Sequence, residues 1–106
     1  MATSFINAIS NGVGTADVIV FTAVSKSIVI GGVLTNTTAS TVPVTIKLRR
    51  VSTDTYLHKD KRLEAGTSFE LSGTNKLILA VGDKIIVSSK VASSVDVVFS
   101  ILQGVA

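Results

Sequence analysis

Residues 28–48 read IVIGGVLTNTTASTVPVTIKL, two apolar runs rich in β-branched residues on either side of a small polar connector. β-Branched side chains are stiff at χ1 and suit a pleated sheet better than a helix. Two such runs separated by polar turn residues are typical of antiparallel strands that pair with each other. The stretch therefore predicts an all-β protein in which 28–34 and 42–48 form a strand pair.

The composition of the whole chain agrees with this expectation. Val, Ile and Thr account for 38 of the 106 residues, whereas Trp is absent and Tyr occurs once, so the core is expected to be aliphatic. No window longer than about 10 residues keeps an apolar period of 3.6 residues, and we expect little or no helix. A chain of 106 residues is near the common size of a single domain.

Short apolar runs bounded by turn residues recur along the chain at intervals of about 8–12 residues, which is typical of sandwiches. Strands are expected at 17–23, 26–34, 42–51, 56–63, 68–72, 76–81, 84–91 and 95–102. They predict a single antiparallel β-sandwich of about eight strands, Ig-like or jelly-roll-like, with a small closed barrel as the alternative. We expect 84–91 to pair with 95–102, and residues 1–14 to form an N-terminal arm or a first edge strand before a sandwich domain at 15–106.

Within these strands the side-chain alternation predicts which residues face the core. In one strand the expected inward residues are Val44, Ile46 and Leu48, and in the last strand they are Val95, Val97, Phe99 and Ile101. Pro43 lacks an N–H and belongs at the start of a strand or on an edge. The loss of alternation at Arg50 and Val51 indicates a bulge or the end of a strand.

The chain contains few charged residues to cover its surface. Charged residues make up 16% of the sequence, below the usual quarter, and the mean hydropathy is positive. We expect partner subunits to cover part of this surface, with a neutral Ser/Thr-rich surface as the alternative. No apolar run approaches the ~18 residues of a membrane span, and the N-terminus lacks the basic region of a signal peptide. We expect no membrane partner, and production and use in the cytosol or release by lysis.

No motif in the sequence predicts a reaction. The only histidine, His58, stands among alternating charges without a Gly-x-Ser-x-Gly motif, and we interpret it as a solvated side chain. The seven carboxylates are scattered rather than spaced as metal ligands, and Cys is absent. Gly31-Gly32 is not followed by Lys-Ser/Thr, so we expect a bulge or the close approach of another backbone there, not a phosphate loop. We expect no catalytic residue, no metal and no cofactor.

The cationic residues are unevenly distributed along the sequence. Six of the ten cationic residues fall within 16 positions, namely Lys47, Arg49, Arg50, Lys59, Lys61 and Arg62. If the two strands that carry them are neighbours, the six form a positive contact patch. Three interpretations stay open: a solvated sheet face, contact with an acidic protein partner, or contact with nucleic acid phosphates. Nucleic acid is the least expected, because only Tyr56 is close enough to stack on a base.

The order of segments from about residue 15 to 103 resembles the small β-sandwich virion proteins of tailed bacteriophages. The resemblance rests on the Leu34-Thr35-Asn36-Thr37 end of a long strand, on the Ala65-Gly66-Thr67 turn, and on the Val81-Gly82-Asp83-Lys84 turn, taken together and in this order. Residues 1–14 have no clear counterpart in the pattern. The resemblance implies a non-enzymatic structural protein that assembles as multimers in the virion, with copies of itself and other virion proteins as partners. Head decoration, neck and tail are all compatible with it, and production in the host cytoplasm is implied.

Overall fold

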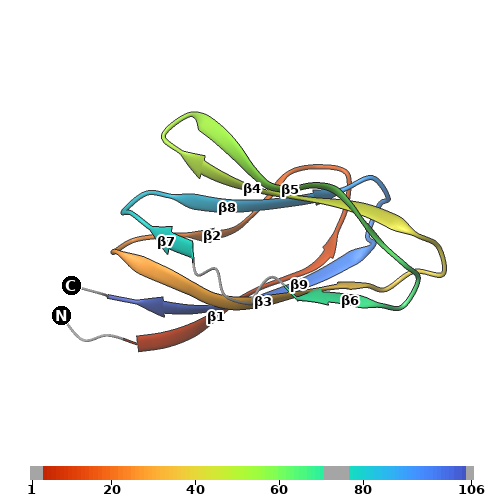
Figure 1. Ribbon diagram of the computed structural model, residues 1–106, viewed down its shortest axis with the longest axis horizontal. Helices are drawn as coiled ribbons and strands as arrows, with labels where there is room; N and C mark the ends of the chain where they lie inside the picture. Colours follow the sequence, from red (N-terminus) through yellow and green to blue (C-terminus); the bar gives the residue numbers. More distant parts are fainter. Residues whose placement is uncertain (1–3, 71–76, 105–106) are drawn as a thin grey trace.

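The computed structural model describes residues 4–70 and 77–104, and strands are the only regular secondary structure within these two ranges (Figure 1). The strands are β1 (Ser4–Val13), β2 (Val18–Thr22), β3 (Ser27–Asn36), β4 (Val42–Arg50), β5 (Thr53–Leu63), β6 (Ser68–Glu70), β7 (Leu77–Leu79), β8 (Lys84–Ser89) and β9 (Val95–Gln103). The all-β prediction is confirmed. The described residues contain nine strands where about eight were expected, because the segment expected as an arm or an edge strand forms β1. Across the described ranges, no helix has the length and apolar character needed to cross a membrane.

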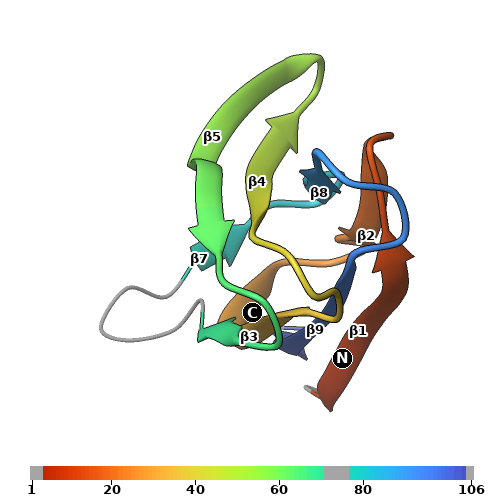
Figure 2. The same ribbon diagram turned by 90° about the vertical axis from the view of Figure 1, so that its right-hand side faces the viewer.

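Two antiparallel sheets make up the protein. Sheet A has the strand order β1-β9-β3-β6, with β7 also pairing with β3, and sheet B has the order β2-β8-β4-β5. Figure 2 shows them as two layers, with β2, β8 and β4 in one and β1, β9 and β3 in the other. The sandwich prediction is therefore confirmed, and the two sheets remain separate instead of closing into a barrel.

Alternate residues of the central strands form the core, as the side-chain periodicity predicts. The inward row of β9 consists of Val95, Val97, Phe99 and Ile101, all of which are fully buried. On the opposite sheet Val44 and Ile46 of β4 are buried, and Leu48 packs against the same cluster. Lys47 and Arg49 thus lie on the outer face of sheet B.

The expected pairing of the two runs in 28–48 is wrong. β3 lies in sheet A beside β9, whereas β4 lies in sheet B between β8 and β5. Residues 37–41 therefore carry the chain from one sheet to the other and do not close a hairpin. Side-chain alternation indicates which face of each strand is buried, but it does not identify the partner strand. The polar connector is compatible both with a hairpin and with a crossing between the two sheets.

The expected pairing of 84–91 with 95–102 is also wrong, since β8 lies in sheet B and β9 in sheet A. The connection between β8 and β9 is hydrogen-bonded to the end of β1 and to the residue that follows it. The N–H of Ser89 donates to the carbonyl of Gly14 at 2.8 Å, and the N–H of Ser94 donates to that of Val13 at 3.0 Å. These hydrogen bonds satisfy backbone groups where the chain crosses between the sheets. In a hairpin, the same groups would be paired with neighbouring residues.

The expected bulge lies directly before Gly31-Gly32, because the register between β3 and β9 shifts between Val29 and Gly31 and leaves Ile30 without a partner on β9. The close neighbour of Gly32 is not another backbone, however, but the ring of Phe99. A Cβ on Gly32 would lie 2.7 Å from Cε1 of that ring, closer than real Cβ atoms approach. Gly32 is therefore required by the core aromatic that lies against it.

We predict that Gly32→Ala lowers the free energy of unfolding by about 3 kcal/mol, because the new methyl group overlaps the Phe99 ring in a packed core. Urea denaturation at neutral pH measures the change. Gly66→Ala is the matched control, since Gly66 has φ +68° but open space around its Cβ position. It should lose only about 1 kcal/mol, from backbone strain. Equal losses for the two variants would contradict the steric explanation.

Asn36 organises the crossing from β3 to β4. Its side chain is fully buried, and its amide donates to the carbonyl of Ser40 at 2.7 Å and to that of Leu63 at 2.9 Å. Its side-chain oxygen accepts from the N–H of Thr38 at 2.9 Å and from the Thr38 hydroxyl at 2.8 Å. One side chain thus joins the end of β3, the connector and the end of β5.

Asn36→Asp should lower the free energy of unfolding at pH 7 by about 3 kcal/mol or more. The change keeps the shape of the side chain but removes both N–H donors and places a buried carboxylate opposite two carbonyl oxygens. Denaturation curves of the variant and of Asn11→Asp, a control at an exposed position in β1, measure the difference. Similar stability of both variants would show that the Asn36 amide does not hold the crossing.

Candidate functional site

The six cations of the expected contact patch lie on β4 and β5, which are neighbouring antiparallel strands. This confirms the pairing on which the patch depended. In Figure 2 the connected ends of the two strands extend away from the other layer of the sandwich. The surroundings of the six side chains, however, divide them into two groups, apart from Arg50, which forms a separate ion pair.

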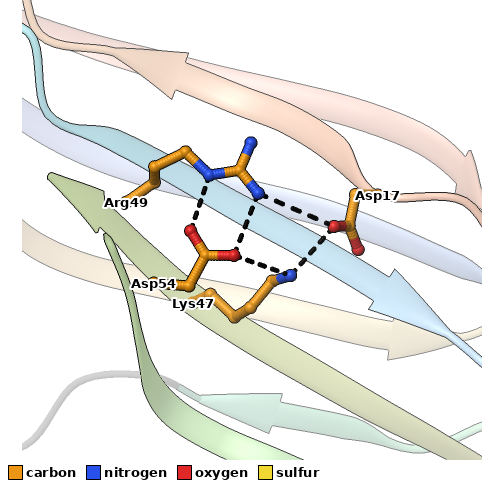
Figure 3. Close-up of polar contacts among 4 residues, drawn as sticks. All are labelled: Asp17, Lys47, Arg49 and Asp54. Carbon is orange, nitrogen blue, oxygen red and sulfur yellow. Dashed lines mark hydrogen bonds and ion pairs between the residues drawn. The ribbon is translucent and has the colours of Figure 1, made fainter. Parts of the chain in front are cut away.

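The first group belongs to an ionic network on the outer face of sheet B (Figure 3). Nζ of Lys47 lies 2.9 Å from Asp17 and 3.2 Å from Asp54. Arg49 donates two hydrogen bonds to the Asp54 carboxylate, from Nε at 2.6 Å and from Nη2 at 2.9 Å, and also lies 4.0 Å from Asp17. Two cations and two carboxylates cancel, so Lys47 and Arg49 add no net charge to this face.

The network shields an apolar position. Ile86 of β8 lies between Lys47 and Ile19 in the strand register, and its outward-facing side chain is fully buried. Lys47 itself is only 9% exposed. A long side chain can cover apolar surface with its methylene groups while its charged end reaches polar partners. The network therefore closes the outer face of sheet B over Ile86.

The electrostatics of the network shift the pKa values of its members. The two hydrogen bonds from Arg49 are the main reason why the pKa of Asp54 falls to about 2; partial burial opposes this shift and the bond from Lys47 adds to it. The hydrogen bond to Asp17 is the main cause that raises the pKa of Lys47. Both shifts favour the charged forms, so Lys47 and Asp54 are ionised at neutral pH.

Arg50, at the end of β4, is paired separately. It donates from Nε and Nη2 to the Asp83 carboxylate, the shorter contact being 2.6 Å. Asp83 is 2% exposed and also accepts from the N–H of Ala80 at 2.8 Å, closing the turn before β8. The hydrogen bond from Arg50 is the main cause that lowers the pKa of Asp83. Arg50 thus attaches the β4 end to that turn.

The second group, Lys59, Lys61 and Arg62, lies on β5 at the edge of sheet B and is exposed. Nζ of Lys59 lies 5.2 Å from the centre of the Tyr56 ring, and that of Lys61 lies 4.9 Å from the centre of the Phe69 ring. Among the residues described, none of these three cations has a carboxylate within salt-bridge distance. The uncompensated positive charge is therefore half of the expected cluster and follows one edge strand.

The sequence analysis did not identify the acidic partners, and two of the three are distant along the chain, whereas Asp54 lies five residues after Arg49. Asp17 lies 30 residues before Lys47, and Asp83 lies 33 residues after Arg50. The only available signal was the presence of carboxylates at the ends of other strands. Their pairing with β4 depends on the strand order β2-β8-β4, which the sequence does not specify.

His58 differs from its expected solvated state. It is half-buried, and its ring packs edge-on against Phe69 of β6 with 4.8 Å between centroids. Within residues 4–70 and 77–104 no three His, Asp or Glu side chains are close enough together to hold a metal ion. His58 therefore contributes to packing where β5 faces β6.

The sequence analysis missed the most distinctive surface, which is the outer face of sheet A. In the strand register, Phe5 of β1 lies opposite Leu102 of β9, Leu102 opposite Ile28 of β3, and Ile28 opposite Ile78 of β7. We call these four residues the apolar row. Phe5 is 73% exposed and Ile78 58%. Ile9, Val98 and Val33 form a second, parallel apolar line on the same face.

A shallow hollow of about 300 Å³ adjoins the apolar row. It is lined by Phe5, Ile6, Asn7, Ile30, Ser100 and Ile101. None of these side chains is charged, and the polar ones are a single amide and a single hydroxyl. The hollow therefore offers apolar contact instead of groups for acid–base chemistry.

Comparison of the chain with models of protein families, with curated protein sequences and with solved structures found no match.

The stability of the protein should fall as the pH is lowered from about 4 toward 2. Because the folded pKa of Asp54 is depressed from 3.8 to about 2, the stabilisation from its ion pairs is complete above 3.8 and is lost as the pH falls through 2. Urea titrations at several pH values should show a smaller acid-dependent loss for Asp54→Asn than for the wild type. Glu64→Gln, at an exposed site, should keep the wild-type slope, and a wild-type slope in Asp54→Asn would contradict the assignment.

Proposed function

We propose that this chain is a non-enzymatic structural protein of a tailed-phage virion that assembles as multimers. Within the virion, capsid decoration is our first choice, with a neck or tail position next. The proposal combines the sequence resemblance with the geometry of the surface. A small, rigid sandwich suits a site that is repeated many times on a particle.

The observation that carries the assembly role is the apolar row. It crosses four strands without a polar residue, and its two end members are more than half exposed. Soluble monomers rarely leave a large continuous apolar patch in water, and such patches commonly mark contact surfaces.

The alternative is a binding module that uses the basic cluster to hold nucleic acid or an acidic partner. Ion pairing weakens it, because Lys47, Arg49 and Arg50 already face carboxylates of the same chain. Only Lys59, Lys61 and Arg62 are left to meet phosphates or acidic groups. Binding of this kind would weaken steeply as the salt concentration rises.

Electron microscopy of phage particles tests the proposal. Antibodies against the purified chain should label virions at regular positions, and the chain should sediment with particles purified from a lysate. Its solution mass at micromolar concentration should exceed that of one chain. The proposal fails if the chain never accompanies virions and remains a stable monomer. Salt-sensitive binding to nucleic acid, abolished by Lys59→Ala/Lys61→Ala/Arg62→Ala, would favour the alternative.

A further inference from the structure

The edges of the two sheets differ in how strongly they resist pairing with another chain. β5, at one edge of sheet B, carries charged side chains, and its register with β4 shifts twice. β2, at the other edge, has five residues and one register shift, and β6 and β7 have three residues each in the part of the chain that the structure describes. Charges, bulges and short length all hinder the addition of a strand to an edge.

β1, the remaining edge strand, has none of these features along most of its length. Residues 4–10 read SFINAIS, without a charge, a proline or a glycine, and they pair with β9 in unbroken register. The register shifts only beyond Ser10. Within the described ranges no strand pairs with the other side of β1. Alternate backbone N–H and C=O groups along this segment therefore face outward without a strand partner.

The side chains of the segment are self-complementary. Phe5 and Ile9 point to the outer face and are 73% and 61% exposed, with Asn7 between them on the same face. If a second β1 runs antiparallel with Asn7 opposite its own copy, Phe5 lies opposite Ile9 of the copy, and Ile9 opposite Phe5. Aromatic and β-branched residues form favourable cross-strand pairs. Residues 4–10 contribute no charge to repel the copy.

We infer that β1 pairs antiparallel with β1 of a second copy of this chain around a two-fold axis at Asn7, joining the two A sheets into one. This inference names the self-contact of the proposed structural role and rests on it. A symmetric contact of this type uses the same segment on both subunits. Seven paired residues form roughly six to eight backbone hydrogen bonds.

The pairing also extends the apolar surface. The apolar row ends at Phe5 on β1, and in the joined sheet it continues into Ile9 of the copy and from there into Val98 and Val33 of the copy. Two separate faces thus become one apolar face across both subunits. A strand of a different protein could form the same backbone hydrogen bonds. Only a second β1 necessarily places an Ile9 opposite Phe5 and a Phe5 opposite Ile9.

A charge-pair experiment tests both the contact and its register. Phe5→Lys/Ile9→Lys places two cations opposite each other twice and should reduce the solution mass by half or more, to a single chain if β1 is the only self-contact. Phe5→Lys/Ile9→Glu places Lys opposite Glu twice and should restore the wild-type mass. Sedimentation at micromolar concentration measures these changes. Val24→Lys, a charge at an exposed apolar position outside the strands and outside the apolar row, is the control and should leave the mass unchanged.

A disulfide test provides a second readout. The chain contains no cysteine, so Asn7→Cys introduces a single thiol on the proposed axis. Directly opposite residues of antiparallel strands have Cα atoms about 4.5–5.5 Å apart, which a disulfide can bridge. Mild oxidation should convert Asn7→Cys into covalent dimers, whereas Val24→Cys, at an exposed position outside the apolar row, should give few.

The outcomes separate this inference from the virion proposal. A wild-type multimer that Phe5→Lys/Ile9→Lys leaves intact, or an Asn7→Cys chain that stays monomeric on oxidation, overturns the β1 contact while multimer assembly still stands. Recovery of mass in Phe5→Lys/Ile9→Glu, together with Asn7→Cys dimers, supports it. A wild-type monomer at micromolar concentration overturns the β1 contact, and particle labelling then decides the virion role on its own.

Discussion

The buried amide of Asn36 is the interaction on which the arrangement of the two sheets depends. It lies where the chain leaves sheet A and enters sheet B, and its four side-chain hydrogen bonds hold the connector in that crossing path. Because β3 and β4 are both interior strands, this crossing assigns a central strand to each layer. Hydrophobic burial drives the layers together, but it is not directional, and a buried polar side chain that must be satisfied can select one path of the chain.

The two layers present opposite chemistry to solvent, and this difference follows from which strands each contains. Sheet B brings β2, β4 and β5 together, so carboxylates at Asp17 and Asp54 meet the cations of β4 and neutralise them. Sheet A brings together strands whose outward residues are mostly apolar. The molecule therefore has one outer face closed by its own ion pairs and one that can gain free energy by contact. An apolar outer face beside an edge strand without a strand partner in the described ranges is typical of a contact surface between subunits.

Much of the local structure could be predicted from the sequence, because side-chain alternation is a local signal. The inward rows of β4 and β9 follow from it, and the turn at Gly82 follows from its turn residues. The strand pairing could not be predicted, since β3 and β4 are adjacent in sequence but paired with distant strands. The contacts of the candidate site could not be predicted for the same reason. Asp17 and Asp83 lie near β4 only because of the strand pairing in sheet B. His58 contacts Phe69 only because β5 and β6 lie in facing layers. Outward apolar residues are visible in the sequence, but they become one row only when the register aligns Phe5 with Leu102 and Ile28.

The contrast between β5 and β1 can be explained by what each edge has to avoid. The uncompensated cations of the chain's basic cluster lie on β5, where they cost little and repel an approaching strand. The bulge at Asp60, with its φ of +52°, further distorts that edge. A lysine at position 5 or 9 would protect the β1 edge against pairing with another strand. The fold would tolerate it, because the side chains of Phe5 and Ile9 are already largely exposed and contribute little to the core. Two large apolar side chains at exposed edge positions instead expose apolar surface to water at a cost, and part of that cost would be recovered if Phe5 and Ile9 packed beside Ile9 and Phe5 of a second β1.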